Sequence, residues 1–254
     1  MKRIIYVALA LALWTGAAAA LPENMYFQAM HDEMLRTRKQ LQVKGSAKPF
    51  FIVYQLRKLI WDVDVAAALG VPYQRDVFAP ALVARVYMYA GDGKLNSSGF
   101  TASYQNEASS ARLADSYDAI RHGLWQLSDA QYIQAADLAE KKEAYLRQKN
   151  VQQNLPDFSR APQAQYIQEF AAAPKTAPAQ YQEWANELSA AGKDLPYVEH
   201  YHVAIRASRK EHYFLDSEGD WSQWAQPEKK VTFTATASPL MMKEKLNSYK
   251  AAEK

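Results

Sequence analysis

Several residue types and motifs that commonly support catalysis are missing from this sequence. It contains no cysteine, which excludes disulfide bonds, a thiolate nucleophile and cysteine-bound metals. No His-Glu dipeptide occurs, so the zinc-protease motif HExxH and its longer-spaced relatives are absent. The nine glycines form neither a GxGxxG dinucleotide fingerprint nor a phosphate-binding P-loop. The sequence on its own therefore points to no catalytic residue.

A strong charge of either sign is also missing. The formal net charge is +3 over 254 residues, and removing Lys2 and Arg3 from the 30 basic residues leaves 28 against 27 acidic ones. Nucleic-acid-binding domains carry a clear basic excess, so we expect no nucleic-acid partner. The content of 49% hydrophobic and 22% charged residues is typical of a globular domain.

The first twenty residues are typical of a secretory signal peptide. A positive start at Lys2 and Arg3 precedes the apolar run 4–14, and Ala18 and Ala20 offer a small-residue cleavage site. The run is too short to span a bilayer well, although an uncleaved anchor is the alternative. We expect cleavage after Ala20, a periplasmic or secreted mature protein, and no membrane span after cleavage.

Helix-like and strand-like segments are mixed along the mature chain, residues 21–254. Helical periodicity or composition predicts helices at 24–41, 116–127, 128–149, 166–170, 179–191 and 240–254. Alternating or β-branched runs predict strands at 50–56, 60–69, 81–89, 198–205, 212–215 and 231–236. The intervening segments 70–80 and 90–112 read as loops. This order predicts one α+β domain, an antiparallel or mixed sheet covered by helices on one face, with the proline-rich segment 151–178 as a possible internal boundary.

Several side chains have expected positions in that fold. Trp125 is predicted to anchor the long helical region to the sheet, and Ser128 to cap a second helix after a bend. The mixed-charge run 140–143 reads as a solvated helix face. Asp62 and Asp64 share one face of a strand, where a solvated edge is the simplest interpretation.

The carboxylates of Asp62 and Asp64 could in principle hold a metal, but a histidine pair is the better suggestion. His200 and His202 are spaced i, i+2, which places both imidazoles on one face of a strand. Zinc requires three or four ligands, and the sequence nominates no third. We therefore predict no cofactor, and zinc only if a partner chain completes the site.

Aromatic residues are the strongest sign of a binding surface. They make up 12% of the chain, with 16 tyrosines and 6 tryptophans, and aromatic rings with polar tips suit both sheet faces and interfaces. The predicted partner-binding or peptide-binding residues are Trp61, Tyr87, Tyr89, Tyr201 and Tyr213.

Five stretches of the chain resemble the secreted branch of the TldD/PmbA family, the metallopeptidase-like proteins historically called modulators of DNA gyrase. They lie at 30–37 (M-x-x-E-x-x-R-T), 48–54 (K-P-F-F-I-V-Y), 86–100 (V-Y-M-Y-A-G-D with N-S-S-G-F), 117–159 and 213–219 (Y-F-L-D-S-E-G). In the fourth stretch the order Leu-Trp, Asp, Tyr around Trp125, Asp129 and Tyr132 carries the similarity, followed by L-P-D-F-S. The resemblance runs from about Met25 to Ser238 and concerns the N-terminal half of the family.

The resemblance implies an N-terminal TldD/PmbA-type domain without the family's catalytic part. Members carry a zinc-binding HExxxH helix and a further ligand in the C-terminal half, and neither is present in this sequence. The leading hypothesis is a non-catalytic extracytoplasmic domain that binds a peptide or a catalytic TldD/PmbA-type homologue. One alternative is a subunit of a split zinc metallopeptidase, and another is an envelope scaffold or small-ligand binder.

Overall fold

The computed structural model describes residues 21–99, 109–153, 155–159, 161–170, 177–195 and 198–237. Its helices are α1 (Met25–Gln40), α2 (Tyr117–Lys149), α3 (Pro178–Ala190) and the 3-10 helix η1 (Ala191–Asp194). Its strands are β1 (Pro49–Ala68), β2 (Val71–Phe78), β3 (Ala81–Ala90), β4 (Ser109–Leu113), β5 (Gln165–Ile167), β6 (Val198–Asp216) and β7 (Trp221–Ala237). The predicted leader, residues 1–20, and the predicted helix 240–254 lie outside the described residues.

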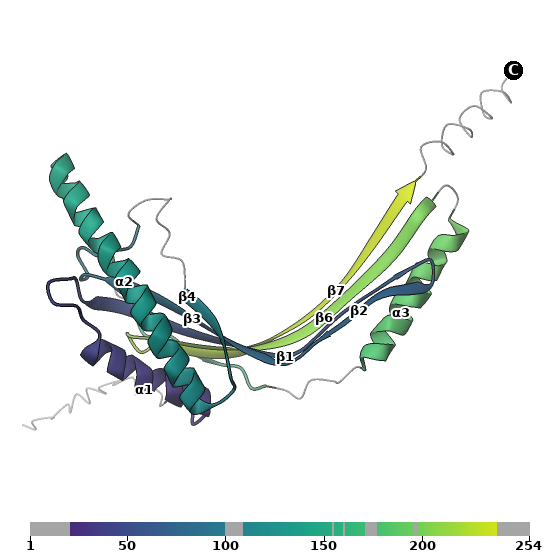
Figure 1. Ribbon diagram of the computed structural model, residues 1–254, viewed down its shortest axis with the longest axis horizontal. Coiled ribbons are helices and arrows are strands. Elements are labelled where there is room, and N and C mark those ends of the chain that lie inside the picture. Colours follow the sequence, from purple (N-terminus) through teal and green to yellow (C-terminus); the bar gives the residue numbers. More distant parts are fainter. Residues whose placement is uncertain are drawn as a thin grey trace, which may run out of the picture.

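The seven strands form one mixed sheet. Its order is β4-β3-β1-β6-β7-β5, and β2 pairs with β1 beyond the end of β3. Every pairing is antiparallel except that of the short β5 with β7. The long strands β1, β6 and β7 run through the whole sheet, which bends midway (Figure 1). We call the half that contains β3, β4 and β5 the proximal arm and the half that contains β2 the distal arm.

A β-bulge in β1 keeps the apolar side chains of both arms on the same face. Leu59 pairs with Lys210 and Trp61 with Arg209 on β6, so Ile60 is one extra residue. Because side chains alternate with period two, the inserted residue shifts the buried set of β1 from even to odd positions. The proximal buried residues Ile52, Tyr54 and Leu56 and the distal ones Val63, Val65 and Ala67 therefore share one face, which we call the covered face.

Helices α1 and α2 cover this face in the proximal arm. Asn24 caps α1 by accepting a hydrogen bond from Phe27 N at 3.0 Å, and Ser116 caps α2. Both helices bury apolar residues against β1, β3 and β6, as in Met30, Leu124 and Leu82. At the centre, the buried Tyr54 hydroxyl lies 2.9 Å from the hydroxyls of Thr37 and Ser128.

Helix α3 covers the same face in the distal arm, below the other end of the sheet in Figure 1. Pro178 occupies its first turn, where the missing N–H costs nothing. Tyr181 and Ala185 pack with Val65, Val203 and other residues of β1 and β6 in a second, smaller core. All described helices thus lie on one face of the sheet, which confirms the predicted α+β architecture.

Several predicted boundaries are wrong. Helix α2 is one continuous helix, because Ser128 is buried inside it with its hydroxyl near that of Tyr54. Strand β1 spans both strands predicted at 50–69, and β6 likewise joins those predicted at 198–205 and 212–215. The last third is therefore a two-stranded hairpin, closed at Gly219 in a left-handed conformation with φ +97°.

Three predicted loops or helices are strands. Residues 71–78 form β2 as an exposed edge strand, and 109–113 form β4. The segment predicted as a helix at 166–170 begins as β5, which pairs with β7. None of the three is long or strongly patterned enough to be separated from a loop by periodicity.

Three side-chain expectations are also corrected. Trp125 is 40% exposed and lies over the Arg36 guanidinium rather than the sheet. Lys142 is buried, unlike its exposed neighbour Lys141. Asp62 is buried on the central strand β1 and pairs with Arg206 at 3.1 Å.

Candidate functional site

The second face of the sheet, which we call the open face, has no described helix against it. In the proximal arm the pairings place Gln55 and Arg57 of β1 beside Arg85 of β3, and His212 of β6 beside Trp224 of β7. The side chains opposite the core are thus polar, basic and aromatic rather than uniformly charged. Such a surface suits a ligand that carries both charge and apolar groups.

A small cavity of about 140 Å³ lies at the centre of this surface. Its lining includes Gln55, Arg57, Arg85, His212 and Trp224. Arg57 is opposite Val83 on one side and His212 on the other, and Arg85 is opposite Gln55. Arg57 and Arg85 are therefore diagonal neighbours on adjacent strands, a relation that brings long side chains within reach of each other.

An aromatic stack forms one wall of the cavity. The His212 and Trp224 rings are parallel within 5°, with their centroids 4.7 Å apart. Burial lowers the pKa of His212, and the positive charges of Arg57 and Lys210 act in the same direction. The imidazole is consequently biased toward its neutral form, which stacks on tryptophan without the cost of a desolvated charge.

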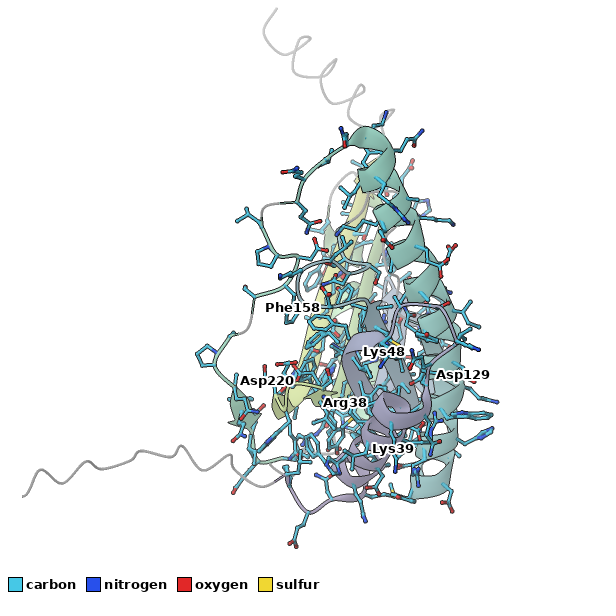
Figure 2. All side chains as sticks on the ribbon, turned by 90° about the vertical axis from the view of Figure 1, so that its left-hand side faces the viewer. Arg38, Lys39, Lys48, Asp129, Phe158 and Asp220 are labelled. Atoms are coloured by element: carbon cyan, nitrogen blue, oxygen red, sulfur yellow. The ribbon has the colours of Figure 1, made fainter. Side chains whose placement is uncertain are left out.

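A second aromatic group lies at the proximal end of the open face. Phe51 stacks on Tyr89 with centroids 6.2 Å apart, and Phe158 contacts Phe51 at 4.8 Å. Figure 2 shows Phe158 on the side of the strands opposite α2. The segment after α2 thus crosses the end of the sheet and limits the open face there.

The outer edge of β7 is unpaired over most of its length. Only 221–223 pair with β5, and no other described strand pairs with the rest. The N–H of Gln168 donates to Gln223 O, and the N–H of Ala225 donates to the Gln168 side chain. Odd-numbered residues of β7 therefore direct their backbone groups outward. Pro227, which has no N–H, occupies one of these positions, as is usual for an edge strand.

Beyond Pro227 the outward backbone groups belong to Lys229, Val231, Phe233 and Ala235. Residues 231–237 are all exposed, and Val231 and Phe233 keep 46% and 54% of their surface accessible. Their side chains lie on the covered face beside the distal core, since they are opposite Ile205 and Val203. An edge of this kind is a template for pairing with a further strand.

The five aromatic residues predicted to bind a partner fall on both faces. Tyr87 and Tyr89 lie on the open face, half-buried. Tyr213 is on the covered face in the proximal core, 4% exposed. Tyr201 packs beside Gly192 of η1, and Trp61 lies against the distal core. The structure therefore does not bring the five together.

The predicted histidine pair lies on the open face of the distal arm. His200 is exposed, His202 is half-buried and 6.3 Å from the Tyr73 ring. Within the described parts of the chain, no group of three or more His, Asp or Glu side chains is placed to hold a metal ion. Within the same residues, no helix is long and apolar enough to cross a membrane.

Sequence reasoning missed Arg57, Arg85, His212 and Trp224 as neighbours. Each lies in an alternating segment of its own strand, but the sequence does not give the register that joins the four strands. One usable signal was Arg85, the only charged residue in the strand predicted at 81–89.

Comparison with known proteins gives structural similarities only. No protein-family model matches the sequence, and no curated protein matches it. Similar solved structures include TldE from Thermococcus kodakarensis, with 12% identity, a TM-score of 0.40, and coverage of 83% of this chain and 43% of that one. Proteins described as modulators of DNA gyrase from Thermotoga maritima and Bacteroides thetaiotaomicron are 8% and 12% identical, with TM-scores of 0.39 and 0.43. The match includes 84% of this chain in both cases, and 44% and 40% of the length of the two other proteins.

The chain thus spans less than half the length of the solved structures that it matches. The TldD/PmbA-like fold expected from the sequence agrees with the names of these structures.

Proposed function

We propose that this chain is an extracytoplasmic binding module without a catalytic centre of its own, which takes up an extended polypeptide segment along the outer edge of β7. The observation that carries the proposal is the run of outward backbone groups from Lys229 to Ala235, which pairs with no described strand. Strand addition to such an edge supplies affinity through main-chain hydrogen bonds. The exposed Val231 and Phe233 side chains supply apolar contacts at alternate positions.

The segment belongs either to a peptide or to a partner chain of the metallopeptidase type, as the sequence resemblance suggests. In the second case the complex is a split zinc peptidase, and the zinc ligands come from the partner. The two cases predict the same edge contact. They differ in whether the bound segment is cleaved or is a stable part of the partner.

The test uses the mature chain and a panel of ten-residue peptides with alternating apolar and polar residues and no proline. Isothermal titration of wild type, Val231→Pro and Val231→Ala compares affinities. Proline removes one outward N–H, whereas alanine keeps it and serves as the matched control. We expect Val231→Pro to weaken binding at least tenfold and Val231→Ala to weaken it less than threefold.

Two results would contradict the proposal. One is equal binding by the proline and alanine variants, since the edge hydrogen bonds would then be irrelevant. The other is zinc-dependent cleavage of the same peptides by the isolated chain, which would show a catalytic centre within it.

A further inference from the structure

The cavity on the open face is a ligand site separate from the edge of β7. We propose that Arg57 and Arg85, together with His212 and Trp224, bind a carboxylate group carried on an apolar or aromatic moiety. This inference does not rest on the strand-addition proposal, because the cavity lies in the proximal arm and the exposed edge belongs to the distal arm. Its support comes from charge, hydrogen bonding and size.

Among the described residues, the two guanidinium groups have no acidic partner. Both side chains are exposed and line the same cavity, and no carboxylate of the described residues lies within ion-pairing distance of Arg57 or Arg85. Glu228, an acid on the same face, is engaged by Lys210 at 3.2 Å. As diagonal neighbours on adjacent strands, the two guanidinium groups are within reach of each other, and their like charges repel. A bound anion would relieve that repulsion, and the planar arginine fork suits a carboxylate.

The neighbouring groups add features that a simple basic surface lacks. The Nε2 atom of His212 is buried beside the cavity and has no hydrogen-bond partner among the described residues. Its ring is held in place by the parallel stack on Trp224. The indole in turn gives the cavity an apolar wall, against which an aromatic or aliphatic group attached to the carboxylate can pack.

The size of the cavity restricts the ligand. A volume of about 140 Å³ is well below the roughly 300–1,000 Å³ of sites that enclose a drug-sized molecule. A carboxylate with a few attached atoms fits within it, while the remainder of the ligand lies across the open face. The C-terminal residue of a peptide and a small aryl or alkyl carboxylic acid share this chemistry.

The test is isothermal titration of the mature chain with N-acetylphenylalanine as the carboxylate probe. Three comparison ligands separate the contributions to affinity. The amide of the probe tests the negative charge, phenylphosphonate tests the planar geometry of the carboxylate, and phenylalanine with a free amino group tests the preference for a blocked peptide terminus. We expect the acid to bind at least tenfold more tightly than the amide and than the phosphonate. Equal binding of acid and amide would overturn the proposal, and so would tighter binding of the phosphonate.

Variants identify the site. We expect Arg57→Gln/Arg85→Gln to weaken binding of the acid at least tenfold, and each single variant to weaken it at least threefold. The matched control Lys229→Gln/Lys230→Gln removes the same charge from β7 and should leave affinity unchanged. The single variants keep the test decisive if the double variant does not fold. Wild-type affinity in the single arginine variants would overturn the assignment.

Discussion

The buried ion pair between Lys142 and Asp157 provides a sharp test of the packing at the proximal end. The Nζ of Lys142 donates to Asp157 Oδ2 at 2.6 Å and to Ser98 O at 2.9 Å. The same carboxylate accepts from Asn96 N at 2.8 Å and from the Gln153 side chain at 2.8 Å. One ion pair therefore joins α2, the turn after β3 and the segment that follows α2.

Replacing Lys142 with methionine should be costly. Only 8% and 13% of the two side chains is accessible, so the variant leaves a nearly buried carboxylate without its counter-ion. Breaking a buried pair costs about 3–5 kcal/mol, and the remaining accessibility and two N–H donors favour the lower end, about 3 kcal/mol. Lys141 is the matched control, since its pair with Asp137 is about half exposed and surface pairs contribute about 0–1 kcal/mol.

The assay is urea unfolding of wild type, Lys142→Met and Lys141→Met, followed by circular dichroism. We also expect Asp157→Asn to be destabilising and the Lys142→Met/Asp157→Asn double variant to lose less than the sum of the single losses, because the residues are in contact. The reasoning is refuted if Lys142→Met and Lys141→Met change the free energy of unfolding equally.

Three further predictions concern the core, the distal arm and the bulge. Burial raises the pKa of Tyr54 to about 12, so folding favours the neutral phenol. The resulting contribution to the free energy of unfolding is fully present below pH 10 and is lost as the pH rises to 12. The loss amounts to at most about 3 kcal/mol, and unfolding at several pH values should show a shallower decline in Tyr54→Phe. Gly192→Ala would place a Cβ within 2.4 Å of the Cβ and Cγ of Tyr201, so we expect a loss of about 1–3 kcal/mol in thermal unfolding, which a control Ala191→Ser should not show. Deletion of Ile60 should return the distal apolar side chains to the open face, and limited proteolysis should then cleave the distal arm first while wild type resists.

The sequence predicted the fold class because the strongest patterns belong to the two cores. Helices α1 and α3 were found within a few residues, since the apolar residues of each recur at helical spacing. The continuity of β6 was missed because of its middle segment, residues 206–211. This segment lies between the part of the strand covered by α1 and α2 and the part covered by α3. There Arg209 and Glu211 lie on the covered face and form an ion pair at 3.9 Å, so polar residues occur on both faces and the alternation disappears.

Helix α2 shows how a tertiary contact changes the meaning of a local signal. Ser128 resembles an N-cap in sequence, but its hydroxyl lies near that of Tyr54 inside the core. Trp125 was expected in the sheet interface and instead contacts Arg36 of α1. In both cases the partner is far away in sequence, and no local pattern identifies it.

The candidate sites were only partly predictable for the same reason. Tyr87 and Tyr89 could be assigned to a sheet face, but which face stays open depends on where the helices pack. The cavity requires four strands in register, and the free edge requires that the pairing of β5 with β7 stops at Gln223. Both properties arise from long-range pairing rather than from any motif.

Strand addition at this edge can be followed residue by residue by amide hydrogen exchange along β7, with and without a bound peptide. Residues 229, 231, 233 and 235 should exchange fast in the unbound chain, because their N–H groups point outward, whereas 230, 232 and 234 should be protected by β6. Addition of the peptide that binds most tightly should slow the odd-numbered set at least tenfold and leave the even-numbered set unchanged. Unchanged exchange at the odd-numbered amides in a saturated complex would contradict strand addition at this edge.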